Sequence, residues 1–172
     1  MIDLALPKGA LSAEQLETLM HRAVKTLMWW EKIPDTREAR KIAWAFVNEH
    51  EPQHVFVGGL PPGRPRYRFR VHTIEGLMDD RAKQGVMRDL TRLVLETEGV
   101  SLDADNAARV CALCASTRAE TGAPPGIRFR RPAISPASPR SQSLRKTSWN
   151  EWMARERQTL SDTSRDHMTP GE

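Results

Sequence analysis

Residues 8–28 read KGALSAEQLETLMHRAVKTLM, and residues 75–95 read EGLMDDRAKQGVMRDLTRLVL. In each stretch a glycine is soon followed by a side chain that favours a helix N-terminus, Ser12 in the first and Asp79 in the second. Apolar residues then recur at helical spacing, and Gly9 set on Gly76 aligns them without a gap. The aligned pairs are Leu19 with Val86, Met20 with Met87, Ala23 with Leu90, and Leu27 with Val94. The sequence therefore predicts one helix twice, 67 residues apart.

Each predicted helix has strand patterns on its flanks. Residues 1–7 and 67–73 alternate between apolar and other side chains, which is typical of strands with one buried face. A second strand is predicted at residues 42–48, followed by a turn-rich segment and residues 54–57 running into Gly58-Gly59. The pattern indicates an α/β fold of two tandem β-α-β units, a two-layer sandwich with both helices on one face of a shared sheet. Its open face favours oligomerisation.

Charge separates the chain into two parts. Residues 1–116 hold 16 basic and 16 acidic side chains, whereas residues 117–172 hold 10 and 6 and so carry the whole net charge of +4. The first part is the predicted double β-α-β domain, and the second is a basic tail rich in Pro, Ser and Arg that we expect to be disordered. Its interspersed acids make nucleic-acid binding unlikely. No apolar stretch approaches the ~20 residues of a membrane span, so a cytoplasmic location is expected by default.

The repeat fails where the tail begins. At the 67-residue offset, residues 48–50 should be echoed at residues 115–117, but those residues differ, and the periodicity is lost from there onward although Gly59 falls on Gly126. Residues 112–131 can be reverse-translated and then read from the third base of each codon. With suitable synonymous codons, this shifted frame encodes a Glu-His pair opposite Glu49-His50 and a glycine opposite Gly59. We interpret the tail as the product of a frameshift near residues 111–114. The alternative is a genuine disordered extension.

The two cysteines, Cys111 and Cys114, form a lone C-x-x-C pair. One such pair supplies only two of the four ligands of a tetrahedral zinc site, and no thioredoxin-like strand-to-helix context surrounds it. We interpret both residues as small buried hydrophobic side chains. No metal site and no cofactor is predicted.

Two segments carry a resemblance to a known family. They are KGALSAEQ at residues 8–15 and VFVGG at residues 55–59, and the second is followed by the strand with Val71-His72 and by the turn Glu75-Gly76. In this order they resemble the tautomerase superfamily of 4-oxalocrotonate tautomerase-like proteins. The fused two-unit layout is similar to its cis-3-chloroacrylic acid dehalogenase branch. The resemblance covers about residues 1–116.

The resemblance implies a homotrimer and an N-terminal proline that works as a base in keto-enol isomerisation of small carboxylate-bearing compounds. Counting back from Gly9, the proline position falls immediately before Met1. The family's arginine positions fall on Ala10, Leu77 and Ile74, and its helix histidine on Leu27, so dehalogenation is not expected.

These departures leave a reduced set of candidate site residues. We predict the amine of Met1 as the catalytic group, and as substrate contacts Arg109, Arg70, His72 and Phe56. The leading hypothesis is an isomerase of the tautomerase type. The alternative is a catalytically inactive member of the same fold that binds a small molecule or a protein.

Overall fold

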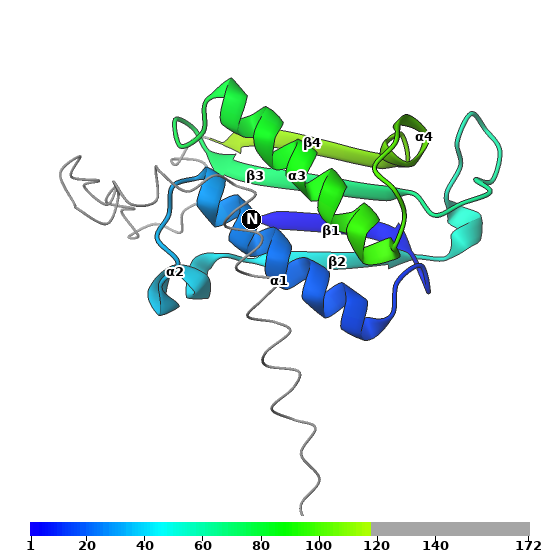
Figure 1. Cartoon of the computed structure of the whole chain (residues 1–172), viewed down its shortest axis with the longest axis horizontal. Helices are drawn as coiled ribbons and strands as arrows, with labels where there is room; N and C mark the ends of the chain where they lie inside the picture. Colours follow the sequence, from blue (N-terminus) through cyan, green and yellow to red (C-terminus); the bar gives the residue numbers. More distant parts are fainter. Residues whose placement is uncertain (118–172) are drawn as a thin grey trace, which may run out of the picture. The chain divides into compact units, whose positions relative to one another are not determined.

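The computed structural model describes residues 1–117, to which all structural statements below refer (Figure 1). No helix in this part of the chain is long and apolar enough to cross a membrane. The elements in chain order are β1 (Ile2–Pro7), α1 (Ala13–Trp30), α2 (Arg37–Ile42), β2 (Ala45–His50), the 3-10 turn η1 (Pro52–His54), β3 (Tyr67–Ile74), α3 (Asp80–Glu98), α4 (Ala104–Ala107) and β4 (Val110–Thr117).

The four strands form one mixed sheet in the order β2-β1-β3-β4. Strand β1 runs parallel to β2, β3 runs parallel to β4, and the central pair β1 and β3 is antiparallel. Both long helices, α1 and α3, lie side by side on one face of the sheet (Figure 1). This arrangement confirms the predicted α/β fold of two β-α-β units in two layers.

The internal repeat extends to the strand register. Ala5 pairs with Asn48 in the first unit, and 67 residues later His72 pairs with Ala115 in the second. The short helices follow the same offset, because α2 begins at Arg37 and α4 at Ala104. The backbone of β4 therefore keeps the repeat through Thr117, although its side chains do not echo those of β2.

Both long helices begin at the predicted caps. The Ser12 hydroxyl accepts a hydrogen bond from the backbone N–H of Gln15 at 3.1 Å, and the Gln15 side chain accepts one from the Ser12 N–H at 2.8 Å. The Asp79 carboxylate accepts from the Ala82 N–H at 2.7 Å. These bonds satisfy N–H groups that have no partner within a helix. Helix α3 ends at Gly99, whose positive φ a glycine adopts without strain.

Alternation along the central strands defines two different faces. The side chains that face the helices are almost fully buried; they are Ile2, Leu4, Leu6, Tyr67, Phe69 and Val71. The residues between them face the other side of the sheet, where Arg68 and Arg70 are exposed and Asp3 and His72 are partly exposed. We call this second side the open face.

Two sequence predictions need correction. The second strand was expected at residues 42–48, but residues 37–42 form helix α2, and the strand begins only at Ala45. The Thr36 hydroxyl caps this helix by accepting from the Ala39 N–H at 3.1 Å, and this local bond outweighs the apolar pattern that suggested a strand. The two cysteines were expected to be buried, but Cys111 lies opposite Arg68 on the open face of the edge strand β4 and is exposed, and Cys114 is only partly buried. Residues 52–54, in the segment predicted to be rich in turns, form a 3-10 turn, and a single bridge joins Val57 and Leu60. The predicted disordered tail and its frameshift lie outside the described residues, apart from Thr117.

Candidate active site

The amine of Met1 lies at the start of the central strand β1. It donates a hydrogen bond to the carbonyl oxygen of His72 at 3.0 Å, and the His72 N–H donates to the Met1 carbonyl at 2.9 Å. On the other side, the Ile2 N–H donates to the Trp44 carbonyl oxygen at 2.9 Å. Neighbouring strands therefore hold the first residue from both sides, so the position of the amine is fixed by the sheet.

A buried carboxylate interacts with this amine. Glu31 follows the last turn of α1 and is only 8% exposed. The Thr73 hydroxyl, also buried, donates a hydrogen bond to Glu31 Oε1 at 2.6 Å. Burial raises the pKa of Glu31, while the Thr73 hydrogen bond and the positive charge of the amine act in the opposite direction.

The pKa of the amine is shifted in the direction that suits a base. Its partial burial lowers its pKa below the ordinary value for an α-amine, and the negative charges of Glu31 and Asp3 offset part of that shift. Because an α-amine ordinarily titrates at about 7.7–8.0, a lowered pKa makes a larger fraction neutral at pH 7. A neutral amine has the lone pair that accepts a proton.

A thiol and a histidine complete the surroundings of the amine. Cys114 shares its helix-facing row of the sheet with Ile2 and Val71, and burial raises the pKa of its thiol. Charge interactions link this thiol with both Glu31 and the amine. On the open face, His72 lies opposite Met1, and its Nε2 lies 3.5 Å from the Asp3 carboxylate.

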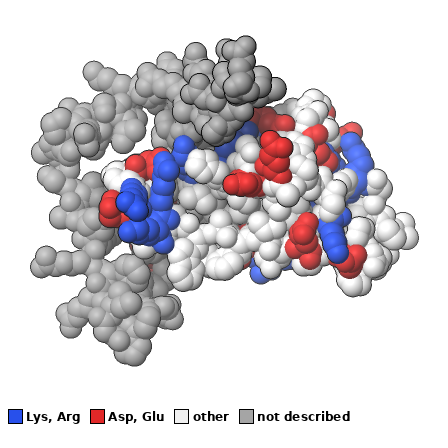
Figure 2. Space-filling view, turned by 90° about the horizontal axis from the view of Figure 1, so that it is seen from below, with Lys and Arg blue, Asp and Glu red and all other residues white. Residues whose placement is uncertain are grey.

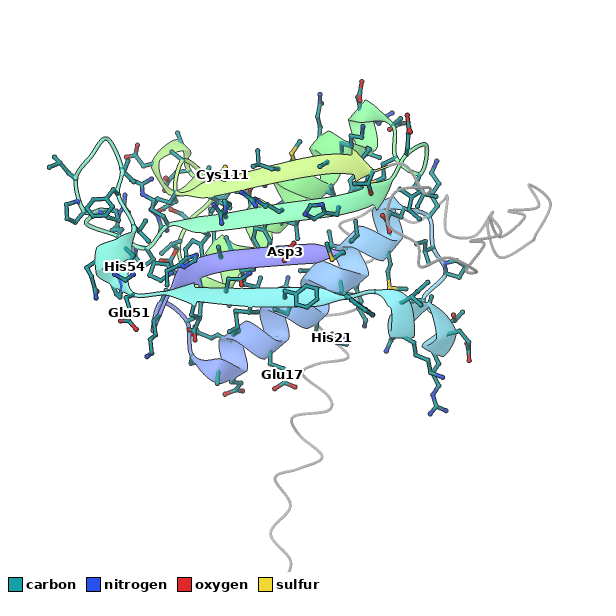
Figure 3. All side chains as sticks on the ribbon, turned by 180° about the vertical axis from the view of Figure 1, so that it is seen from behind. Asp3, Glu17, His21, Glu51, His54 and Cys111 are labelled. Carbon is teal, nitrogen blue, oxygen red and sulfur yellow. The ribbon has the colours of Figure 1, made fainter. Side chains whose placement is uncertain are left out.

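The structure brings together only some of the predicted site residues. Met1 and His72 are neighbours, and Arg70 lies one pleat further along β3, opposite Asp3. Phe56, 61% exposed, follows η1 beyond the carboxyl ends of β1 and β2, as the position of His54 in Figure 3 indicates. The amine lies at the opposite end of β1, so Phe56 is not near it.

Arg109 also lies at the far end of the sheet and is almost fully buried. Its guanidinium binds both carboxylate oxygens of Glu98, at 2.9 and 2.5 Å, and also donates to the Asn106 side chain and the Pro65 carbonyl oxygen. These contacts engage the arginine within the second unit. We therefore leave it out of the candidate site around Met1.

Sequence reasoning missed Glu31, although the repeat contained a signal for it. A charged residue just beyond a helix is usually solvated, so no special role was predicted. The 67-residue offset places Glu31 on Glu98, and both are largely buried carboxylates at the C-terminal ends of the two corresponding helices, α1 and α3. In the second unit Arg109 neutralises the carboxylate. Its counterpart in the first unit is Ile42, and the amine of Met1 is the cation that interacts with Glu31.

The chain is similar to known proteins in structure but not in sequence. No family model matches the sequence, and no curated protein is similar to it. Among solved structures, N1, a member of the cis-3-chloroacrylic acid dehalogenase family, matches with a TM-score of 0.63 at 11% identity, covering 85% of this chain and 99% of its own. This chain has the tautomerase fold.

Other structures with the tautomerase fold agree. The asymmetric trimer of a fused 4-OT matches with a TM-score of 0.60 at 13% identity, covering 75% of this chain and 95% of that one. Macrophage migration inhibitory factor of Toxoplasma gondii matches with a TM-score of 0.54 at 16% identity, covering 74% of this chain and 98% of its own. The predicted resemblance is confirmed for the fold, and these identities establish nothing beyond it.

Proposed function

We propose that the chain is an isomerase of the tautomerase type, in which the amine of Met1 moves a proton between the keto and enol forms of a small carboxylate-bearing compound. The observation that carries the proposal is the placement of this amine beside the buried Glu31 and Thr73, with its pKa lowered by burial. A neutral amine on a rigid strand meets the geometric and electrostatic needs of a general base.

We assign roles to three side chains in this proposal. Glu31 stabilises the protonated amine after it has taken a proton from the substrate, because the two groups interact directly through charge. Thr73 holds the Glu31 carboxyl through its 2.6 Å hydrogen bond. His72, opposite Met1 on the open face, is the proposed contact for the substrate carboxylate. No cofactor enters this scheme.

We further propose that the working unit is a homotrimer. Several apolar side chains along the β2 edge are exposed; they are Ile42, Trp44, Phe46 and Val47. Figure 2, which views the molecule from the β2 side, shows a broad area there that is neither basic nor acidic. Exposed apolar side chains and a strand edge that is unpaired among the described residues both favour contact with another copy. The fused 4-OT with this fold forms an asymmetric trimer.

The alternative function is a catalytically inactive protein that binds a small molecule. It is favoured by one observation, the hydrogen bond between the Met1 amine and the His72 carbonyl oxygen. This bond stabilises the protonated amine and so opposes its action as a base. The two functions differ in whether the amine turns over substrate.

The pH dependence of the reaction tests the proposed isomerase. Conversion of phenylpyruvate between its enol and keto forms, followed at high protein concentration, is expected to be slow and to rise with pH. The midpoint should lie below the ordinary pKa of an α-amine, because only the neutral amine is a base and burial lowers its pKa.

Glu31→Gln sharpens this test. The substitution keeps an oxygen that can accept from Thr73 but removes the charge that raises the pKa of the amine, so the midpoint should move to lower pH. Glu17→Gln, on the exposed face of α1, is the matched control and should leave the midpoint unchanged. Light scattering on the same samples should give the mass of three chains. A midpoint that Glu31→Gln does not move would rule out this role of the carboxylate.

A further inference from the structure

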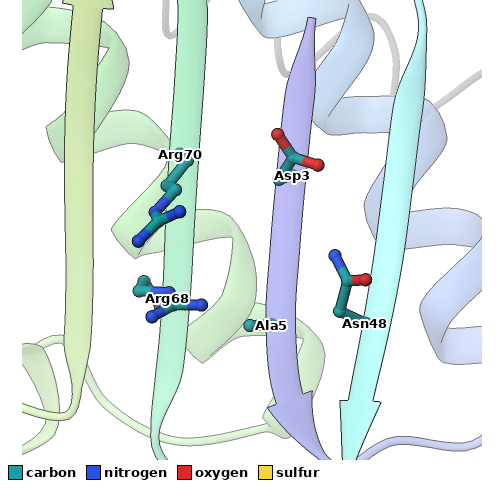
Figure 4. Close-up of a pocket in the computed structure, with 5 residues that line it drawn as sticks. All are labelled: Asp3, Ala5, Asn48, Arg68 and Arg70. Carbon is teal, nitrogen blue, oxygen red and sulfur yellow. The ribbon is translucent and has the colours of Figure 1, made fainter.

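A shallow hollow lies on the open face of the sheet, further along β1 than the Met1 amine. It has a volume of about 130 Å³ and is lined by Asp3, Ala5, Asn48, Arg68 and Arg70 (Figure 4). The three adjacent strands β2, β1 and β3 supply these side chains, so the hollow has a rigid floor. A hollow of this size suits a small ion or metabolite rather than a drug-sized ligand.

The charge of the two arginines in the hollow is not neutralised by a partner among the described residues. Arg68 and Arg70 make no hydrogen bond or ion pair within the part of the chain that the structure describes, whereas four other arginines there bind carboxylates; these are Arg22, Arg40, Arg88 and Arg109. Figure 4 shows the Arg70 guanidinium turned along β3 toward Arg68. Two neighbouring cations repel each other unless an anion lies between them.

The acidic residue of the hollow does not remove this charge. The Asp3 carboxylate lies 3.5 Å from His72 Nε2, at the Met1 end of the hollow. Asn48, on the opposite side, carries an amide that can donate to an anion. Guanidinium groups bind carboxylate and phosphate oxygens through paired N–H donors, which makes an oxyanion the fitting ligand.

We propose that Arg68, Arg70 and Asn48 form a binding site for a small oxyanion, a carboxylate or a phosphate group. The site is separate from the Met1 amine. In the strand register Arg68 lies opposite Ala5 and Arg70 opposite Asp3, whereas the amine lies at the end of the strand opposite His72. The proposal therefore does not depend on proton transfer by the amine, and it gives Arg70 a different ligand from the substrate contact predicted from sequence.

Calorimetric titration of the full chain tests the site with two probes, inorganic phosphate and succinate. At least one should bind, and the tighter one identifies the preferred head group. Arg68→Gln and Arg70→Gln should each weaken that binding about tenfold or more, because each removes a charged hydrogen-bond donor. Added sodium chloride should also weaken it. Arg81→Gln, the same charge change at an exposed position of α3, is the matched control and should leave the affinity within about twofold.

A measurement on individual residues distinguishes binding of the probe in the hollow from general attraction of anions to a basic surface. In nuclear magnetic resonance spectra, the bound probe should shift the side-chain amide signals of Asn48 and leave those of Gln15, which caps α1, in place. The proposal is overturned if neither probe binds, or if Arg81→Gln weakens binding as much as Arg68→Gln does. It is also overturned if the arginine variants instead change the mass of the particle, because the pair would then serve contact between copies.

Discussion

Replacing Arg109 by Met should lower the free energy of unfolding by about 3–5 kcal/mol, the usual cost of removing one partner from a buried ion pair. The Arg109 side chain is 2% exposed and that of Glu98 is 16% exposed, so water has little access to replace the lost partner. The substitution would leave the Glu98 carboxylate without its guanidinium donor, and the Asn106 side-chain oxygen would keep only the donor from Arg64. Urea unfolding gives the comparison.

Two further variants show whether the ion pair is the cause. Adding Glu98→Gln to Arg109→Met removes the uncompensated charge, so the double variant should be more stable than the sum of the single losses predicts. Lys8→Gln breaks an exposed pair with Glu51, whose side chains are 66% and 49% exposed, and should cost less than about 1 kcal/mol. A loss below about 1 kcal/mol for Arg109→Met would contradict the proposed importance of the pair.

Gly85→Ala should lower the free energy of unfolding by roughly 2–4 kcal/mol. A Cβ atom at this position of α3 would lie 2.2 Å from the Cη2 and Cζ2 atoms of Trp30, so the indole must move. Overpacking costs about 1–3 kcal/mol. Movement of the ring would also break the 2.9 Å bond from Trp30 Nε1 to the buried Asp89, at about 1–3 kcal/mol. The better helix propensity of alanine offsets about 1 kcal/mol of this loss of stability.

Gly63→Ala is the matched control for this prediction. Nothing lies within 4 Å of a Cβ built at Gly63, and its φ is not positive, so the stability should change by no more than about 0.5 kcal/mol. Combining Gly85→Ala with Trp30→Leu should recover part of the loss, because the smaller side chain makes room. Equal stability of Gly85→Ala and the original chain in urea unfolding would show that α1 and α3 do not pack as described.

The fold could be predicted because its signals are local and repeated. Glycines, caps and apolar stripes recur at one offset, and the structure keeps that offset down to the pairing of Ala5 with Asn48 and of His72 with Ala115. Helix α2 escaped prediction because six residues are too few to show helical periodicity. The antiparallel contact between β1 and β3 also leaves no local trace in the sequence.

The candidate site was less predictable, because it depends on contacts between residues far apart in the chain. Met1 and His72 were both predicted, and the pairing of β1 with β3 brings them together. Glu31 was missed because its burial depends on packing beside Thr73, 42 residues away. Arg109 was selected for its position relative to the repeat, which says nothing about its ion pair with Glu98.

The most direct test of the central claim, that an amine at the N-terminal end of β1 works as a base, is the phenylpyruvate enol-keto rate of three matched proteins. These are the chain as given, a variant that begins with proline directly before Met1, and a control that begins with alanine there. A secondary amine in a rigid ring at the position expected from Gly9 should raise the rate on the order of a hundredfold. This is the factor in rate that misplacement of a catalytic group by about an ångström can cost. The alanine control should stay slow. If the proline variant is as inactive as the alanine control while both keep the mass of the original chain, the isomerase account is contradicted and the binding function replaces it. If the original chain already matches the proline variant, the register counted from Gly9 is wrong.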